Sequence, residues 1–377
     1  MATWYNAFGG ARVKHRRFPR PKPWSLLLIL LAHLLWPGPS HAGLPATLAR
    51  GINITGWFRF PASRDPLTLR AWLSDAAMTG LKSAGFTFAR LAIDPAVVEA
   101  SPMRAVLIEQ IRRLQRHGLA VVVSPHPVSW AIDTSPADRA KFVAFWADLA
   151  PMLRDLPPAL TFPEVLNEPV FHNDPASWAR LQEDLRAAIR ATLPNDTIVL
   201  TGNDWGSIAG LLALSPSADR NVVYSFHFYD PAELTTLAAY RPGIDRAALA
   251  RLPFPETNLA ACRDIAATTA EPVTRDLILF WCATTWDDAH VRANLLRAAA
   301  WARIHGVALL AGEFGASIAL NPSARLAWLT LVRQTCAENG IGWALWGYDD
   351  VMGFNIRRPP ENKPLLDRSV LKALGLP

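Results

Sequence analysis

Hydrophobic and polar residues follow two different patterns along the chain after residue 50. Short runs of apolar or β-branched residues, which are typical of buried strands, alternate with longer segments whose apolar residues recur every three or four positions, which is typical of amphipathic helices. Strands are predicted at residues 51–57, 86–93, 119–126, 160–167, 196–201, 222–228, 307–313 and 341–347. Helices are predicted at residues 68–84, 102–117, 136–154, 175–192, 285–305 and 323–339. Gly118, Gly306 and Gly340 directly follow three of these helices, where a helix commonly ends.

The order of these segments indicates the fold class. Strands that alternate with helices lie parallel in one sheet, and eight such units predict an α/β protein of the (β/α)8 type, a TIM barrel. The chain has 377 residues, 51% of them hydrophobic, which is enough for such a barrel as a single domain over residues 43–377. An open, doubly wound sheet is the alternative, but the sequence lacks the glycine-rich phosphate loop that accompanies such sheets.

One connection is much longer than the others. Residues 230–284 separate the sixth strand from the next helix, and a connection of this length is usually functional or carries structure of its own. It contains Cys262 and Cys282, which we expect to form a disulfide if the protein is exported. Cys336 lies in an apolar helical pattern and is expected to be a buried thiol, and no Cys and His spacing is that of a zinc site.

The first 42 residues have the composition of an export signal. Six basic residues precede an apolar run of thirteen residues, Trp24 to Trp36, and the first 42 positions contain no acidic residue. A membrane-spanning helix needs about 20 apolar residues, so this run fits the core of a signal peptide better. We predict that residues 1–42 are a cleavable signal peptide, cut after Ala42, and that the protein is secreted or periplasmic. An uncleaved membrane anchor is the alternative, and Arg16-Arg17 hints at twin-arginine export.

The net charge of the chain is less informative than it looks. The six basic residues of the first 42 positions account for the whole formal charge of +6, so the remaining protein is formally neutral. Neither a nucleic acid nor, after signal cleavage, an anionic membrane is therefore predicted as a partner.

Polar and aromatic side chains lie in or just after several of the predicted strands, toward the end where active-site residues of this kind of barrel lie. These residues are Arg90, His126, Asn167, Glu168, His227, Tyr229, Glu313 and Trp346. Two of them are glutamates, which suggests paired-carboxylate chemistry such as glycoside hydrolysis. In that reaction one acid protonates the leaving oxygen, and a second carboxylate attacks the sugar or activates water.

In their order along the strands, these residues resemble the motifs of glycoside hydrolase family 5, the cellulase-type family within a larger clan of (β/α)8 glycosidases. The resemblance covers about residues 50 to 350. It is carried by an Arg on the second strand, a His ending the third, Asn-Glu-Pro at 167–169, His-x-Tyr at 227–229, a Glu ending the seventh strand and a Trp on the eighth. The resemblance implies that Glu168 is the general acid/base and Glu313 the nucleophile. It implies that the other residues bind substrate: Arg90, His126, Asn167, His227, Tyr229 and Trp346.

Physical reasoning adds expectations about the two glutamates. Arg90 and the Tyr229 hydroxyl are expected to keep Glu313 ionised, whereas no cation is expected beside Glu168, which then stays protonated near neutral pH. Pro169 is expected to favour an extended backbone at Glu168. Glu164 lies four residues earlier on the same face, so we expect it deeper in the barrel as a structural carboxylate paired with a polar neighbour.

These observations predict an exported, retaining β-glycosidase that hydrolyses O-glycosidic bonds of a β-linked glucan, with an endo-β-1,4-glucanase as the first choice. A β-1,3-glucanase and a β-mannanase are the alternatives within the family. A non-catalytic carbohydrate-binding barrel is the alternative of another class, and the retention of both glutamates argues against it. We expect a monomer that binds β-glucan oligosaccharides or polysaccharides and needs neither metal nor cofactor. Trp57, Trp130 and Trp205 follow three strands and are candidates for stacking on sugar rings.

Overall fold

The computed structural model describes residues 43–284, 286–357 and 365–377. The predicted signal peptide, residues 1–42, lies outside the described residues. The described residues form one compact unit. Within the described part, no helix combines the length and the apolar character that crossing a bilayer requires.

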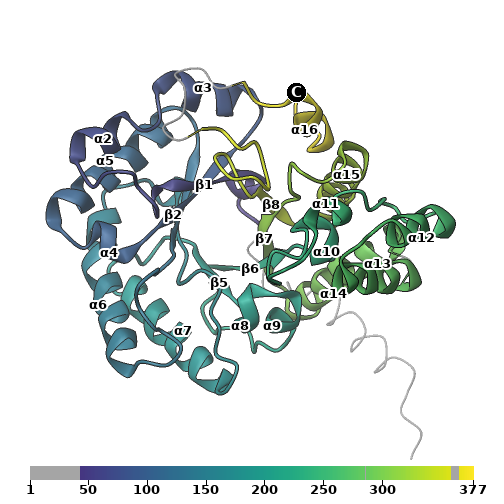
Figure 1. Ribbon diagram of the computed structural model, residues 1–377. Helices are drawn as coiled ribbons and strands as arrows, with labels where there is room; N and C mark the ends of the chain where they lie inside the picture. Colours follow the sequence, from purple (N-terminus) through teal and green to yellow (C-terminus); the bar gives the residue numbers. More distant parts are fainter. Residues whose placement is uncertain (1–42, 285, 358–364) are drawn as a thin grey trace, which may run out of the picture. The chain divides into compact units, whose positions relative to one another are not determined.

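Eight parallel strands form a barrel surrounded by helices, so the predicted (β/α)8 fold is confirmed (Figure 1). The strands are β1 (Arg50–Phe58), β2 (Phe88–Ile93), β3 (Ala120–Pro125), β4 (Thr161–Pro163), β5 (Ile198–Thr201), β6 (Val222–Phe228), β7 (Ala308–Phe314) and β8 (Gly342–Leu345). Their order in the sheet is β4-β3-β2-β1-β8-β7-β6-β5. A single parallel bridge between Glu164 and Val199 joins the two outer strands and closes the barrel. All eight strands coincide with predicted ones.

The predicted helices are present, but the one predicted at 68–84 is divided in two. The Ser74 side chain accepts a hydrogen bond from Ala77 N and begins the second of these helices. The helices that match predictions are α2 (Pro66–Ala71), α3 (Asp75–Ser83), α5 (Ser101–Arg116), α6 (Pro136–Leu153), α7 (Pro175–Arg190), α14 (Asp288–His305) and α15 (Pro322–Glu338). Short elements that were not predicted are η1 (Ala46–Leu48), α4 (Pro95–Val98), η2 (Pro158–Leu160), α8 (Asn203–Gly206), α9 (Ile208–Leu212) and α16 (Arg368–Ala373). Gly306 ends α14 with a φ of 62°, a conformation that glycine adopts without steric cost.

The barrel interior has an apolar floor at the amino ends of the strands. The floor contains Phe88, Ala120, Val122, Phe162, Val199, Val223, Ala308, Leu310 and Ala344. The Phe88 ring fills the space above Gly51, where an added Cβ would lie 2.2 Å from Phe88 Cζ. Side chains alternate along a strand, so Arg90, two residues after Phe88, also points inward and begins a polar layer above this floor.

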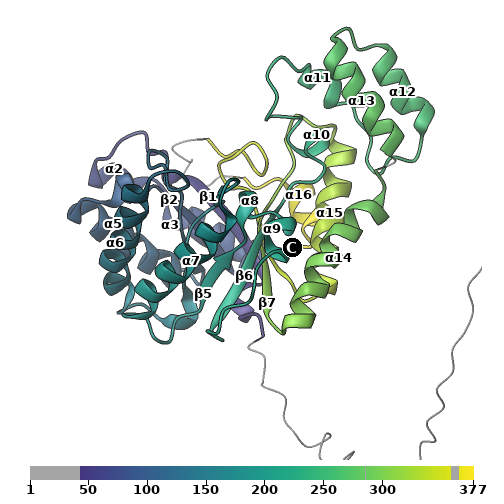
Figure 2. The same cartoon turned by 90° about the horizontal axis from the view of Figure 1, so that it is seen from below.

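The long connection after β6 is a helical insertion. It contains α10 (Ala232–Thr235), α11 (Arg246–Leu249), α12 (Leu259–Ala267) and α13 (Pro272–Thr284). Figure 2 shows α11, α12 and α13 beyond the ends of the barrel helices α14 and α15. Its base is tied to the segment after β7, because Ser317 N donates to Thr235 O (2.8 Å) and Asn321 Nδ2 donates to Leu252 O (2.6 Å).

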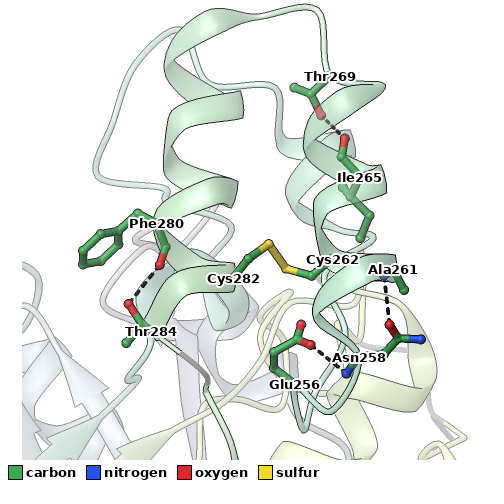
Figure 3. Close-up of a disulfide and its surroundings, with 9 residues drawn as sticks. All are labelled: Glu256, Asn258, Ala261, Cys262, Ile265, Thr269, Phe280, Cys282 and Thr284. Carbon is green, nitrogen blue, oxygen red and sulfur yellow. Dashed lines mark hydrogen bonds between the residues drawn. A yellow bond between two sulfur atoms is a disulfide. The ribbon is translucent and has the colours of Figure 1, made fainter.

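The predicted disulfide lies inside this insertion. Cys262 of α12 and Cys282 of α13 are bonded, with 5.8 Å between their Cα atoms (Figure 3). Nearby, the Asn258 side chain accepts a hydrogen bond from Ala261 N and begins α12. Cys336 is a buried free thiol, as predicted, and burial raises its pKa to about 12.

Replacing both Cys262 and Cys282 by serine is expected to lower the free energy of unfolding by about 3 kcal/mol, because a ring of this size restricts the unfolded chain. Equilibrium unfolding in urea measures the loss, and Cys336→Ser is the control for a cysteine that forms no bridge. An unchanged midpoint in the double variant would mean that the bridge does not stabilise the insertion.

Candidate active site

Arg90 of β2 is the centre of a hydrogen-bond network above the barrel floor. Its fully buried guanidinium uses all five N–H groups that arginine has. Nε and Nη2 each lie 2.7 Å from an oxygen of Glu164, and Nη1 lies 2.6 Å from Glu313 Oε1. The remaining two donors bond Asn53 Oδ1 (2.9 Å) and Asn167 Oδ1 (2.8 Å). Burial opposes the charge, but the carboxylates of Glu164 and Glu313 raise the pKa of Arg90 above its ordinary value.

Glu164 is a structural carboxylate, as predicted. Its side chain is 1% exposed and forms a two-point ion pair with Arg90. Planar, two-point pairing of a guanidinium with a carboxylate is the strongest form of this interaction. The pair fixes the orientation of the guanidinium, so its remaining N–H groups point toward Asn53, Glu313 and Asn167.

Glu313, near the end of β7, has both oxygens occupied. Oε1 accepts from Arg90, and Oε2 accepts from the Tyr229 hydroxyl at 2.9 Å. The side chain is 4% exposed, and burial raises its pKa even though the charges of His227 and Arg90 oppose the shift. Burial and the neighbouring Glu313 raise the pKa of Tyr229 well above its ordinary value, so the phenol stays a donor.

Glu168 has a cationic partner, contrary to expectation. His227 Nδ1 lies 3.0 Å from Glu168 Oε1 and 3.5 Å from Glu313 Oε2, so the imidazole lies between the two carboxylates. Although burial disfavours an imidazolium, Glu313 and Glu168 raise the pKa of His227. Burial raises the pKa of Glu168, but the hydrogen bond and charge of His227, together with the charges of Arg90 and Arg59, outweigh burial and lower this pKa. The expected order, with Glu313 the more acidic group, is therefore wrong for the free site, because burial raises the pKa of Glu313 whereas His227, Arg90 and Arg59 together lower that of Glu168.

The backbone at Glu168 also differs from the expectation. Its φ is 43°, in the left-handed region rather than the extended region that Pro169 favours. Such a residue costs about 1–3 kcal/mol and persists where its surroundings fix it. Here Asn167 N donates to Pro125 O (2.9 Å) and Trp205 N donates to Pro169 O (3.1 Å), so the chain is held on both sides of Glu168. The left-handed turn leaves the side chain 26% exposed at the rim.

His126 and Trp346 lie side by side at the ends of β3 and β8. Their rings are stacked, with centroids 6.0 Å apart and planes inclined by 25°. Burial, and then the charges of Arg59 and Arg90, lower the pKa of His126 well below its ordinary value, so this imidazole is neutral. Its Nε2 contacts Ser124 Oγ at 3.1 Å, and its Nδ1 is buried without a partner in the part of the chain that the structure describes.

Two residues of the site were not predicted. Asn53 of β1 donates to the carbonyl oxygens of Gly312 (3.0 Å) and Leu345 (3.2 Å) while accepting from Arg90. An inward-facing amide in a strand was the signal that could have revealed it. Arg59 directly follows β1, between aromatic residues, and lines the pocket in front of Glu168.

The three candidate tryptophans have different surroundings. Trp57 is fully buried, stacks on Trp72 and donates to Leu69 O (2.8 Å), so the prediction of sugar stacking is wrong for it. Trp130 and Trp205 both line a pocket of about 200 Å³ beside Glu168, and Trp205 is 56% exposed. These two rings are available to a ligand.

The same site offers a cluster of potential metal ligands. One ligand atom each from Glu168, His227 and Glu313 lie within 4.8 Å of one another. Both oxygens of Glu313 already accept hydrogen bonds from Arg90 and Tyr229, and the nearby guanidinium charge disfavours a second cation there. The arrangement fits two carboxylates that share a proton with a histidine better than it fits a metal ion.

The eight predicted site residues thus come together at one rim of the barrel. Residues 51–350 match the family described as Cellulase (glycosyl hydrolase family 5). The chain belongs to glycosyl hydrolase family 5. The resemblance to this family that was inferred from the motifs is confirmed.

Curated family 5 relatives are distant. Endoglucanase 3 of Fibrobacter succinogenes is 23% identical over 331 residues, which cover 80% of this chain and 49% of that protein. The chain therefore spans about half the length of this relative. Endoglucanase C of Acetivibrio thermocellus is 22% identical over 336 residues, which cover 84% of this chain and 96% of that protein.

Solved structures of similar fold include a hyperthermophilic endo-β-1,4-glucanase in complex with substrate. It has a TM-score of 0.69 at 20% identity, over 88% of this chain and 98% of that one. Cel5A of Thermotoga maritima in complex with mannotriose has a TM-score of 0.69 at 22% identity, over 87% and 97% of the two chains. At these identities the likeness establishes the (β/α)8 fold.

Proposed function

We propose that this family 5 protein is a retaining endo-β-1,4-glucanase in which Glu313 is the nucleophile and Glu168 the general acid/base. The distance between the two carboxylates supports the retaining mechanism. An oxygen of Glu168 and an oxygen of Glu313 lie within 4.8 Å of each other. Retaining glycosidases hold the two carboxyl groups about 5–5.5 Å apart, whereas inverting ones need about 6.5–9.5 Å to admit a water molecule.

The surroundings of Glu313 support its role as the nucleophile. Arg90 and Tyr229 hold its two oxygens, so the carboxylate is oriented before substrate arrives. In the first step a Glu313 oxygen attacks the anomeric carbon, the glycosidic bond breaks, and Glu168 transfers its proton to the departing oxygen. In the second step Glu168 takes a proton from water, which attacks the same carbon and releases the sugar from Glu313.

In this proposal, the proton that Glu168 delivers comes from His227, whose Nδ1 is hydrogen-bonded to Glu168 Oε1 at 3.0 Å. His227 holds the proton in the free site, and the negative charge on Glu313 that stabilises it is consumed as the glycosyl bond forms. The proton is then better placed on the leaving oxygen than on the imidazole. Asn167 Oδ1 accepts a hydrogen bond from Arg90 Nη2, which leaves the amide NH₂ of Asn167 free to bond the sugar 2-hydroxyl.

Replacing His227 by asparagine is expected to move the acid limb of the pH profile of kcat/KM to higher pH. The charge of His227 lowers the pKa of Glu313, and burial alone then raises it further, so a higher pH is needed to ionise the nucleophile. The profile is measured with an aryl β-cellobioside. His117→Asn is the matched control, because His117 is a partly exposed histidine at the C-terminal end of α5. An acid limb that moves to lower pH would contradict the assigned coupling.

Relatives named as endoglucanases and a structural neighbour described as an endo-β-1,4-glucanase support the β-1,4-glucan assignment. A β-mannanase is the second candidate, because a structural neighbour of 22% identity was crystallised with mannotriose. The test measures reducing ends and viscosity with carboxymethylcellulose, lichenan, laminarin and mannan. Rapid viscosity loss on the first two supports an endo-β-1,4-glucanase. Activity confined to mannan or to laminarin would replace that assignment, and binding without any hydrolysis would favour the non-catalytic alternative.

We further propose that the protein is exported and acts as a monomer outside the cytoplasm. The basic and apolar N-terminal sequence and the disulfide between Cys262 and Cys282 both suit an oxidising compartment. N-terminal sequencing of the protein from the periplasm or medium is expected to begin at Gly43. A mature product that still contains Trp24 to Trp36 would instead indicate a membrane anchor.

A further inference from the structure

Arg59 is a partly buried cation at the rim that forms no ion pair with a carboxylate in the described part of the chain. Its guanidinium carbon lies 4.7 Å from the centre of the Phe60 ring and 5.9 Å from that of Trp346. Its Nε is buried and has no hydrogen-bond partner, and no ion pair of Arg59 occurs within residues 43–284, 286–357 and 365–377. Burial lowers the pKa of Arg59 even though the charges of Glu313, Glu168 and Asp94 oppose the shift, so these carboxylates do not fully offset the cost of holding the charge away from water.

Other buried or partly buried arginines of the described structure are satisfied by the protein. Arg90 donates to carboxylates and amides, Arg190 to Asp219 and several carbonyls, and Arg325 to the carbonyls of Ala316 and Gly353. Buried polar groups are nearly always paired, so an exception at the rim of a site points to a partner that arrives from outside.

The acidic groups near Arg59 are already engaged. Glu313 is held by Arg90 and Tyr229, and Glu168 is held by His227. Asp94 accepts from Ala96 N (3.1 Å) and Val128 N (3.5 Å) at the start of α4. Asp133 also lines the pocket, but it is an exposed residue that water solvates. No neighbouring carboxylate therefore neutralises Arg59 directly.

Arg59 lies where a bound sugar chain would pass. It lines the same pocket as Trp130, Trp205 and Glu168, so a sugar unit adjacent to the cleaved bond would meet it. A guanidinium is a planar, two-point donor that matches a carboxylate, and the rings of Phe60 and Trp346 limit its freedom. A neutral hydroxyl would satisfy its donors but would not compensate its charge.

We propose that Arg59 is a specificity-determining residue that binds a carboxylate carried by the sugar chain, so the preferred substrate is an acidic β-glycan, with uronic acid units or carboxyl-bearing substituents next to the cleavage point. This inference rests on the proposed glycosidase function and narrows its substrate class. Arg59 acts in binding and does not take part in the bond-breaking steps.

The test compares two soluble cellulose derivatives of equal degree of polymerisation: one neutral, hydroxyethylcellulose, and one oxidised at C6 so that it carries glucuronic acid units. The wild-type protein is expected to have a higher kcat/KM on the oxidised chain. In Arg59→Gln, the ratio of kcat/KM on the oxidised chain to that on the neutral chain is expected to fall by about tenfold or more. Arg64→Gln is the matched control, because Arg64 is exposed on the same segment after β1, and it is expected to leave the ratio unchanged.

The outcomes separate this inference from the proposed function. If neither chain is cleaved, the glucanase proposal fails and this inference fails with it. If both chains are cleaved but Arg59→Gln lowers both activities equally, Arg59 acts only through its charge on Glu168 and Glu313, and the inference alone is overturned. Recovery of the preference in Arg59→Lys, which keeps the charge, supports anion binding.

Discussion

Replacing Glu313 by glutamine is expected to abolish hydrolysis of every substrate, with kcat falling by about 10⁴-fold or more. The amide keeps the size of the side chain and can accept from Arg90 or Tyr229, but it is not a nucleophile, so no glycosyl-enzyme forms. Hydrolysis of an aryl β-cellobioside measures the loss, and an unchanged thermal unfolding profile excludes misfolding as its cause.

The Glu168→Ala variant is expected to fail differently. It lacks the acid, but an aryl leaving group of low pKa needs little protonation, so the first step continues and the intermediate accumulates as a burst. Azide should then release a β-glycosyl azide from Glu168→Ala and an α-glycosyl azide from Glu313→Ala. If NMR finds the α-anomer as the first product of wild-type hydrolysis, the reaction inverts and Glu313 is not the nucleophile.

Replacing Arg90 by methionine is expected to lower the free energy of unfolding by about 3–5 kcal/mol, because Glu164 would remain as a buried charge without a partner. The side chains of this pair are 0% and 1% exposed. Urea unfolding monitored by tryptophan fluorescence measures the change.

The surface provides a matched control for this substitution. Arg70 and Glu109 form an ion pair of similar length (2.8 Å), but their side chains are 42% and 47% exposed. Arg70→Met is therefore expected to cost less than about 1 kcal/mol. Equal losses in the two variants would show that the burial of the Arg90 pair has no energetic consequence. Adding Glu164→Gln to Arg90→Met should restore part of the stability, because it removes the unpaired charge.

The strands and the rim residues could be predicted because each is indicated by a short stretch of neighbouring residues in the sequence. A buried strand is a short apolar run, and its carboxyl end is marked by the polar residue that follows, as with Glu313 after 307–312. Ser74, a typical first residue of a helix, also indicated that the segment 68–84 holds two helices. The continuous apolar pattern of the segment favoured a single helix instead.

The electrostatics of the site could not be predicted in the same way. Arg90 and Glu313 are 223 positions apart, and His227 and Glu168 are 59 apart. Which oxygen each donor reaches depends on the tilt and register of the barrel, and no local pattern reports these. Burial of Glu313 and the approach of His227 to Glu168 then reversed the expected order of acidity. Arg59 was missed for a related reason, since an arginine in a loop reads as a solvated residue until its neighbours are known.

Glu164 has two structural roles in this barrel. Its backbone forms the single bridge that closes the cylinder between β4 and β5, and its side chain reaches across to the arginine that holds Asn167 and Glu313. This weakly hydrogen-bonded seam lies four positions before Glu168, the proposed acid/base residue. We therefore expect loosening of the cylinder at this seam to change the position of Glu168 relative to His227. Warming that opens the seam would then lower activity before the rest of the barrel unfolds.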